Sequence, residues 1–220
     1  MNDSSPQSIP FNTRIGTQTV GPRYGFTAEN RLTETARGIL ALGSDILKIA
    51  LSPEAYGIEA PEELSPAAVA RTLPAFQEVL DLPFTTVFCW VHRGLGGRLV
   101  GPGDADRGVW EAAVYAQVYE LASGLLETYT GSGKTFHLGN WEGDWLLLGE
   151  GQVDADADPT RLAMMQRAFA LRQQAVEDAR ATVPHEHVWV GHYIEVNRPL
   201  DAKDRGLGRV TNAVLPQVAV

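Results

Sequence analysis

GSGKTFHLGNWEGDW, residues 131–145, is the stretch that decides which fold this chain adopts. It opens on a glycine-rich turn, continues as a short apolar run at 135–140 and ends in a cluster of tryptophan and acidic residues. Long helical patterns stand on either side of it, at 109–129 and 159–182. A strand between two helices, with polar residues at its carboxyl end, is typical of a parallel α/β fold.

The same alternation of strand and helix extends along the whole chain. Strand patterns occupy residues 14–20, 46–51, 85–92, 135–140 and 187–197, and helix patterns occupy 29–42, 65–80, 109–129, 159–182 and, more briefly, 209–215. Nearly every strand is apolar on both faces, as expected for a parallel sheet covered by helices. We therefore expect an α/β fold, an incomplete (β/α)8 TIM-type barrel. It would have about five βα units and the start of a sixth strand at 217–220, form one domain over 13–220 and follow a disordered tail at 1–12.

Two parallel architectures fit this alternation, a closed barrel and an open doubly wound sheet. A dinucleotide-binding doubly wound sheet usually carries a glycine-rich turn directly after its first strand. The corresponding segment here, GPRYG at residues 21–25, does not have that pattern. We therefore favour the barrel.

Residues 131–135 (GSGKT) resemble the end of a phosphate-binding loop, but the resemblance fails on two points. Thr128 stands where that loop needs a glycine. A phosphate-binding loop also follows a strand and precedes a helix, so that the amides at the helix N-terminus face the phosphate. Here the order is helix, turn, strand, which predicts a structural turn at the amino end of the sheet.

Composition restricts the partners of the protein. The net charge of −9 and the pI near 5.0 argue against a nucleic-acid-binding surface. The chain shows no apolar run long enough to span a membrane and no basic-then-apolar start typical of a secretory signal. We expect a cytoplasmic protein that binds neither nucleic acid nor membrane, and a buried thiol at the single cysteine, Cys89.

The polar cluster at the end of the fourth predicted strand contains the candidate catalytic residue, Glu142. Alternation of side chains places Asn140 and Glu142 on one face, above Phe136 and Leu138. The amide and the carboxylate would then lie at the mouth of the barrel, where barrel enzymes hold their active sites. Three candidate substrate-binding residues complete the cluster: Trp141, Asp144 and Trp145. Because aromatic faces pack on the apolar faces of pyranose rings, this pattern favours a sugar site.

Other predicted strands add polar groups to the same mouth. The third strand ends in Trp90 and His92, and the fifth carries Tyr193, Glu195 and Asn197 on one face. Convergence of such groups is what indicates a site, since each alone has a structural explanation. Lys48 stands among apolar neighbours in the second strand and therefore needs an anionic partner.

The histidines do not suggest a metal centre. His137, His185, His187 and His192 lack the spacing of known ligand motifs. We expect no metal and no cofactor.

In the stretch 135–145 the sequence resembles the large clan of retaining glycoside hydrolases built on the (β/α)8 barrel. In that clan a glutamate at the end of the fourth strand is the general acid/base, and an asparagine precedes it. The resemblance covers about five βα units and implies hydrolysis of O-glycosidic bonds in a carbohydrate substrate, with Glu142 as acid/base. One departure is that Trp141 separates Asn140 from Glu142.

The nucleophile of that clan is a second glutamate, on the seventh strand. Because this chain ends before a seventh strand, we expect a barrel truncated at its C-terminus. We expect it to be inactive alone and able to self-associate through its open edges. Two other functions remain open. One is a non-catalytic carbohydrate-binding or scaffold barrel, and the other is a different barrel enzyme, a lyase or isomerase that uses Lys48 and Glu142.

Overall fold

The computed structural model describes residues 16–102, 106–149 and 153–218. The strands are β1 (Gly16–Thr19), β2 (Ile46–Ala50), β3 (Thr86–Trp90), β4 (Thr135–Gly139) and β5 (Trp189–His192). The helices are α1 (Arg31–Ala41), α2 (Pro66–Thr72), α3 (Pro74–Asp81), α4 (Arg107–Thr128), α5 (Gly143–Leu148), α6 (Pro159–Thr182) and α7 (Pro199–Arg205). The tail predicted at 1–12 lies outside the described residues.

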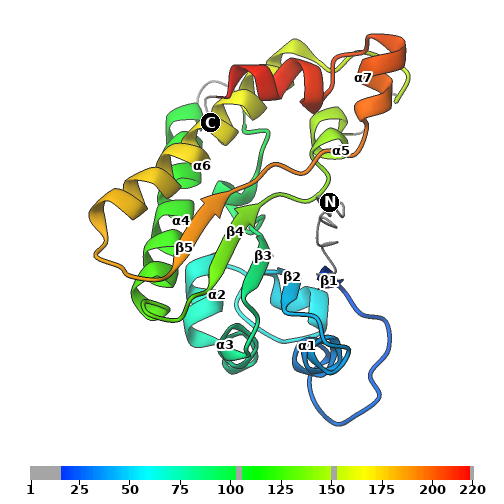
Figure 1. Ribbon diagram of the computed structural model, residues 1–220. Helices are drawn as coiled ribbons and strands as arrows, with labels where there is room; N and C mark the ends of the chain where they lie inside the picture. Colours follow the sequence, from blue (N-terminus) through cyan, green and yellow to red (C-terminus); the bar gives the residue numbers. More distant parts are fainter. Residues whose placement is uncertain (1–15, 103–105, 150–152, 219–220) are drawn as a thin grey trace, which may run out of the picture.

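The five described strands form one sheet in which every neighbouring pair is parallel (Figure 1). Their order in the sheet is β1-β2-β3-β4-β5, the same as their order in the chain. A doubly wound sheet reverses its strand order at a switch point. These five strands contain no reversal, so the alternative of a doubly wound sheet does not fit them.

One face of the sheet is covered by helices and holds the main core. Every second strand residue points into it: Leu47, Ile49, Val87, Cys89, Phe136, Leu138 and Val190. They pack against apolar side chains of α1, α3, α4 and α6, such as Leu32, Phe76 and Leu121. Figure 1 shows α4 and α6 side by side next to β4 and β5. Cys89 is buried in this core, as expected.

A second core lies beyond the carboxyl ends of the strands. It joins the first half of α4 and of α6 to α5 and to the turn Val210–Val214, through buried residues that include Trp110, Leu147, Phe169 and Val210. Neither α5 nor α7 is anticipated by the sequence patterns above. This second core fixes the segments that carry the candidate site residues.

Several element boundaries differ from the sequence-based expectations. The single helix predicted over 65–80 is two helices, α2 and α3, separated at Leu73. The reason is Pro74, which cannot continue a helix but is accepted at the first position of a new one. Ser65 caps α2 as expected, because its side chain accepts a hydrogen bond from the Ala68 N–H at 3.1 Å.

The end of the chain also departs from expectation. The predicted strand 187–197 is shorter, because β5 stops at His192. The predicted helix 209–215 is a π-helical turn followed by the 3-10 turn Leu215–Gln217. The prediction that a sixth strand begins at residue 217 is therefore wrong for Gln217, and residues 219–220 lie outside the described residues.

The most consequential correction concerns which side chains of β4 face the helices. Phe136 and Leu138 point into the helix-covered core, not toward the mouth of a barrel. His137 instead faces the opposite side of the sheet, on which none of the described helices packs (the helix-free side), and its ring stacks there on Phe88 with 4.4 Å between centroids. Alternation alone cannot tell which set of residues faces the helices when both sets are largely apolar.

Candidate functional site

A hollow of about 410 Å³ lies at the carboxyl ends of the first four strands. Its aromatic walls are Trp90, from the end of β3, and Trp141, which follows β4. Val20 and Ala50 contribute from the ends of β1 and β2. In parallel α/β proteins this edge of the sheet is where ligands bind. The structure therefore brings together two of the tryptophans that the sequence indicated.

Glu142 is the next residue after Trp141 and directly precedes α5. Its backbone has φ 26° and ψ 74°, a conformation that costs a non-glycine residue about 1–3 kcal/mol. Its carboxylate has no hydrogen-bond or ion-pair partner within the part of the chain that the structure describes. Glu142 thus stands at the predicted end of the fourth strand, in a strained backbone and with an uncommitted acid group.

Asn140 is buried and serves the framework of the site. Its side-chain amide pairs with the backbone of Glu195: Nδ2 donates to the Glu195 carbonyl at 3.2 Å, and Oδ1 accepts from the Glu195 N–H at 3.1 Å. The Gly143 N–H also donates to the Glu195 carbonyl, at 2.9 Å. A side chain at Gly143 would put its Cβ 2.7 Å from that oxygen, so only glycine allows this approach. Asn140 therefore holds Glu195 in place.

The buried Asp144 and the half-buried Asn197 form a second set of connections. The Asp144 carboxylate accepts backbone N–H bonds from Asn197 and Arg198, both at 2.9 Å, and from Val210 at 2.8 Å. The Asn197 side chain in turn accepts from the Asp144 N–H at 3.0 Å. These bonds tie α5 to the segment after β5. Both residues are committed to structure.

Trp145 is not among the residues that line the hollow. The guanidinium of Arg198 lies over its ring, 4.8 Å from the centroid, and also pairs with Asp201 at 2.5 Å. Arg198 thus occupies one face of this tryptophan. The sequence analysis placed Trp141 and Trp145 in one candidate sugar site, whereas in the structure only Trp141 lines the hollow.

Lys48 has the anionic partner that the sequence demanded. Its ammonium pairs with the Glu195 carboxylate and lies 4.5 Å from the centre of the Trp90 ring. The Trp90 indole N–H donates to the same carboxylate oxygen of Glu195 at 3.0 Å. One oxygen of the Glu195 carboxylate is therefore engaged by both Lys48 and Trp90, on the helix-free side of the sheet.

Tyr193 lies beside this group and borders a further hollow of about 410 Å³, which Gln18 and Phe88 also line. Burial raises the pKa of the Tyr193 hydroxyl, and the nearby charge of Glu195 raises it further. The hydroxyl is buried without a well-aligned hydrogen-bond partner among the described residues.

These contacts show that the sheet is strongly curved toward its helix-free side. Gln18 belongs to β1 and Tyr193 follows β5, yet they line one hollow. Neighbouring strands are about 4.8 Å apart, so a flat sheet would separate β1 from β5 by about 19 Å. The contact of Lys48 in β2 with Glu195 requires the same curvature.

Three more residues near the site carry no motif that sequence reasoning could detect. Ser52 Oγ lies 3.1 Å from Nε2 of His92, which borders the hollow, and burial lowers the pKa of His92. Arg98 also lines the hollow, from the glycine-rich loop after β3. Arg172 is fully buried and donates to the carbonyls of Val91 and Gly97, and burial lowers its pKa to about 10. The partners of Ser52 and Arg172 are distant in sequence.

The GSGKT turn lies at the amino end of β4, as predicted. The Lys134 ammonium donates to the carbonyls of Leu82, at 2.5 Å, and Phe84, at 3.1 Å. Burial lowers its pKa. Helix α4 precedes the turn and β4 follows it, so the turn does not lead into a helix N-terminus as a phosphate-binding loop does.

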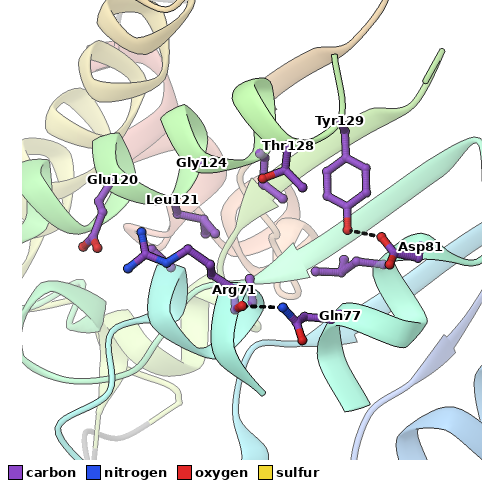
Figure 2. Close-up of a pocket in the computed structure, with 12 residues that line it drawn as sticks. Arg71, Gln77, Asp81, Glu120, Leu121, Gly124, Thr128 and Tyr129 are labelled. Atoms are coloured by element: carbon purple, nitrogen blue, oxygen red, sulfur yellow. Dashed lines mark hydrogen bonds between the residues drawn. The ribbon is translucent and has the colours of Figure 1, made fainter. Parts of the chain in front are cut away.

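Another hollow, of about 300 Å³, opens between α2, α3 and α4 (Figure 2). Two hydrogen bonds join residues of its lining: the Tyr129 hydroxyl donates to Asp81 at 2.9 Å, and the Gln77 amide donates to the Arg71 carbonyl at 2.6 Å. Asp81 and Tyr129 stand where α3 and α4 lead into strands, so that part of the hollow lies toward the amino ends of the strands. We assign no chemistry to it.

The described residues contain no group of three or more histidine, cysteine, aspartate or glutamate side chains placed to hold a metal ion. Over the same residues, no helix has both the length and the apolar character needed to cross a bilayer.

Comparison with models of known families, with curated proteins and with solved structures gave no match. The resemblance to glycoside hydrolases therefore rests on the sequence of residues 135–145.

Proposed function

We propose that this chain is a carbohydrate-active barrel of glycoside-hydrolase type, with Glu142 as its general acid/base. One observation carries the proposal: an aromatic hollow at the carboxyl ends of parallel strands, with a glutamate next to its wall that has no charged partner among the described residues. Trp90 and Trp141 line the hollow, and Glu142 directly follows Trp141. Flat aromatic walls with few polar groups suit the apolar faces of a pyranose ring.

The state of Glu142 supports a catalytic role. A general acid must give its proton to the glycosidic oxygen, which requires a carboxyl group that other side chains do not neutralise. Glu142 meets this condition within the described residues. Its strained backbone also fits, because strain is kept where function needs a particular direction of the side chain.

The second carboxylate of such a mechanism is neither Glu195 nor Asp144. In a retaining enzyme the nucleophile lies about 5 Å from the acid/base and must be free to attack the anomeric carbon. Glu195 is neutralised by Lys48, and Asp144 accepts three backbone N–H bonds. We assign Glu195 and Lys48 to the floor of the site, where they orient Trp90.

We also propose that the curved sheet belongs to a (β/α)8 barrel. The sequential parallel order and the curvature toward the helix-free side support it. Within the described strands, β1 and β5 are edges, and unpaired edges favour association with another chain. We expect self-association that depends on concentration, measurable by light scattering.

The test measures oligosaccharide binding and hydrolysis of aryl glycosides by the whole 220-residue chain. Binding should weaken about tenfold or more in Trp141→Ala, since a stacking face at the centre of a site is lost. Any turnover should be lost in Glu142→Gln. The matched control is Glu127→Gln, which makes the same change at an exposed position of α4.

The other outcomes separate the alternatives. Binding without turnover would favour a non-catalytic carbohydrate-binding barrel. A lyase or isomerase using Lys48 and Glu142 would require Lys48 to leave Glu195, and its activity would fall in Lys48→Met while glycoside binding stayed absent. Absence of binding to every oligosaccharide would refute the proposal.

A further inference from the structure

Among the described residues, the lining of the hollow at the carboxyl ends carries a single permanent charge. Apart from His92, whose lowered pKa favours the neutral ring near neutral pH, Arg98 is the one ionisable residue of that part of the chain that lines it. None of the described acidic residues lines it. In a protein with a net charge of −9, an unopposed guanidinium beside two tryptophans needs an explanation.

Arg98 is also unpaired. Its neighbour Arg93, in the same loop, is buried and pairs with Glu54 while donating to the carbonyls of Pro61 and Glu62. Arg98 is exposed and has no carboxylate partner in the part of the chain that the structure describes. The loop thus contains one arginine committed to structure and one left open to a ligand.

Two buried side chains hold the backbone at Gly97 and Arg98 in place. The buried Trp110 donates its indole N–H to the Arg98 carbonyl at 3.1 Å, and the buried Arg172 donates to the Gly97 carbonyl at 3.2 Å. Gly97 lies so close to His92 that a Cβ would come within 2.1 Å of its backbone. Two large buried side chains therefore fix the backbone at Arg98, while its guanidinium has no partner among the described residues. Such preorganisation reduces the entropy lost on binding.

Resting on the function proposed above, we infer that the sugar bound in this hollow carries a carboxylate, as a uronic acid residue does. The pyranose ring would lie on the tryptophan wall and its carboxylate would accept two parallel N–H bonds from Arg98. The planar guanidinium matches carboxylate geometry, and the apolar lining strengthens a charge-assisted bond. A neutral sugar would leave the guanidinium without a counter-charge.

The experiment compares uronate glycans with their own neutral forms. Binding of pectate, alginate and glucuronan to the whole chain is measured by calorimetry, beside the carboxyl-reduced form of each and beside dextran sulfate. We expect at least one uronate glycan to bind about tenfold or more tightly than its reduced form, because a hydrogen bond to a charged group is lost on reduction. In Arg98→Gln that preference should disappear while the thermal transition stays unchanged.

Arg71→Gln is the matched control, since it removes the same charge from the hollow of about 300 Å³ between α2, α3 and α4. Equal binding of reduced and native glycans would overturn this inference and leave the proposed function standing. Dextran sulfate binding more tightly than every uronate glycan, or a preference that survives in Arg98→Gln, would also overturn it. If no glycan of either kind bound, the proposed function itself would fail.

Discussion

The two ends of the parallel sheet use similar residue types for opposite purposes. At the amino end, GSGKT looks functional, but the Lys134 ammonium donates to two backbone carbonyls, and the Gly131 N–H donates to the Glu186 carbonyl at 2.6 Å. At the carboxyl end, Trp141 is 40% exposed and Glu142 and Arg98 have no charged partner among the described residues. A reactive residue type indicates function where its polar groups remain uncommitted.

The carboxyl end is itself divided. Asn140 and Asp144 flank Trp141 and Glu142 and are buried, and the side chain of each bonds to backbone groups of the segments after β5. The residues with uncommitted polar groups, called the open residues here (Trp141, Glu142 and Arg98), therefore lie next to a buried hydrogen-bonded frame formed by Asn140 and Asp144. This division can be tested residue by residue.

The largest expected effect is at Asp144. Asp144→Ala should lower the free energy of unfolding by about 3–5 kcal/mol, because three backbone N–H groups lose their acceptor in a buried site. Urea denaturation measures this change. Asp204→Ala, an exposed position in α7, should stay within about 0.5 kcal/mol of the native protein. A loss below about 1 kcal/mol at Asp144 would show that α5 is not anchored by this carboxylate.

The next effect tests the amino end. Lys134→Met should cost about 1–3 kcal/mol of unfolding free energy, because two carbonyls lose a buried donor. ATP should not raise the melting temperature of the native protein. An ATP-dependent rise in melting temperature that is lost in Lys134→Met would contradict the comparison, since it would make GSGKT a phosphate site.

A pH dependence of stability should arise from His192, the last residue of β5. Burial lowers the pKa of His192 from 6.5 to about 3. The unfolded chain therefore binds a proton below about pH 6.5 that the native state refuses, and stability falls as the pH drops through this range. His192 should contribute about 1.4 kcal/mol of lost stability by pH 5.5. The measurement is urea denaturation at pH 7 and 5.5. A His192→Gln variant with the same loss would exclude this histidine as the cause.

The smallest effect is a gain of stability at the open residue. Glu142→Gly should raise the unfolding free energy by up to about 1 kcal/mol, because glycine adopts a positive φ without steric cost. Glu142→Ala is the control, since alanine keeps the strain. Equal stability of both variants, measured by thermal unfolding, would mean that the backbone at this position stores no strain and would weaken the case for Glu142.

Local patterns were sufficient for most of the fold. Helix α6 begins at Pro159 behind the capping Asp158, whose side chain accepts from the Arg161 N–H at 3.0 Å, and these residues predict the helix start directly. The strands, the position of Glu142 after the fourth strand and the turn at 131–135 were likewise predicted, because each depends on neighbours within a few residues. The unbroken helix predicted over 65–80 was wrong because Pro74 was not weighed.

By itself, the sequence determined the alternation of strands and helices and the presence of a partner for Lys48. The tertiary structure alone decided which partner that is, which face of β4 meets the helices, and which polar residues remain open. Lys48 and Glu195 stand 147 positions apart, and only a curved sheet brings them into contact. The physical reason is that the two-residue repeat of a strand predicts only that side chains alternate between its faces. Which face meets the helices, and which residue becomes a partner, depends on how distant segments pack.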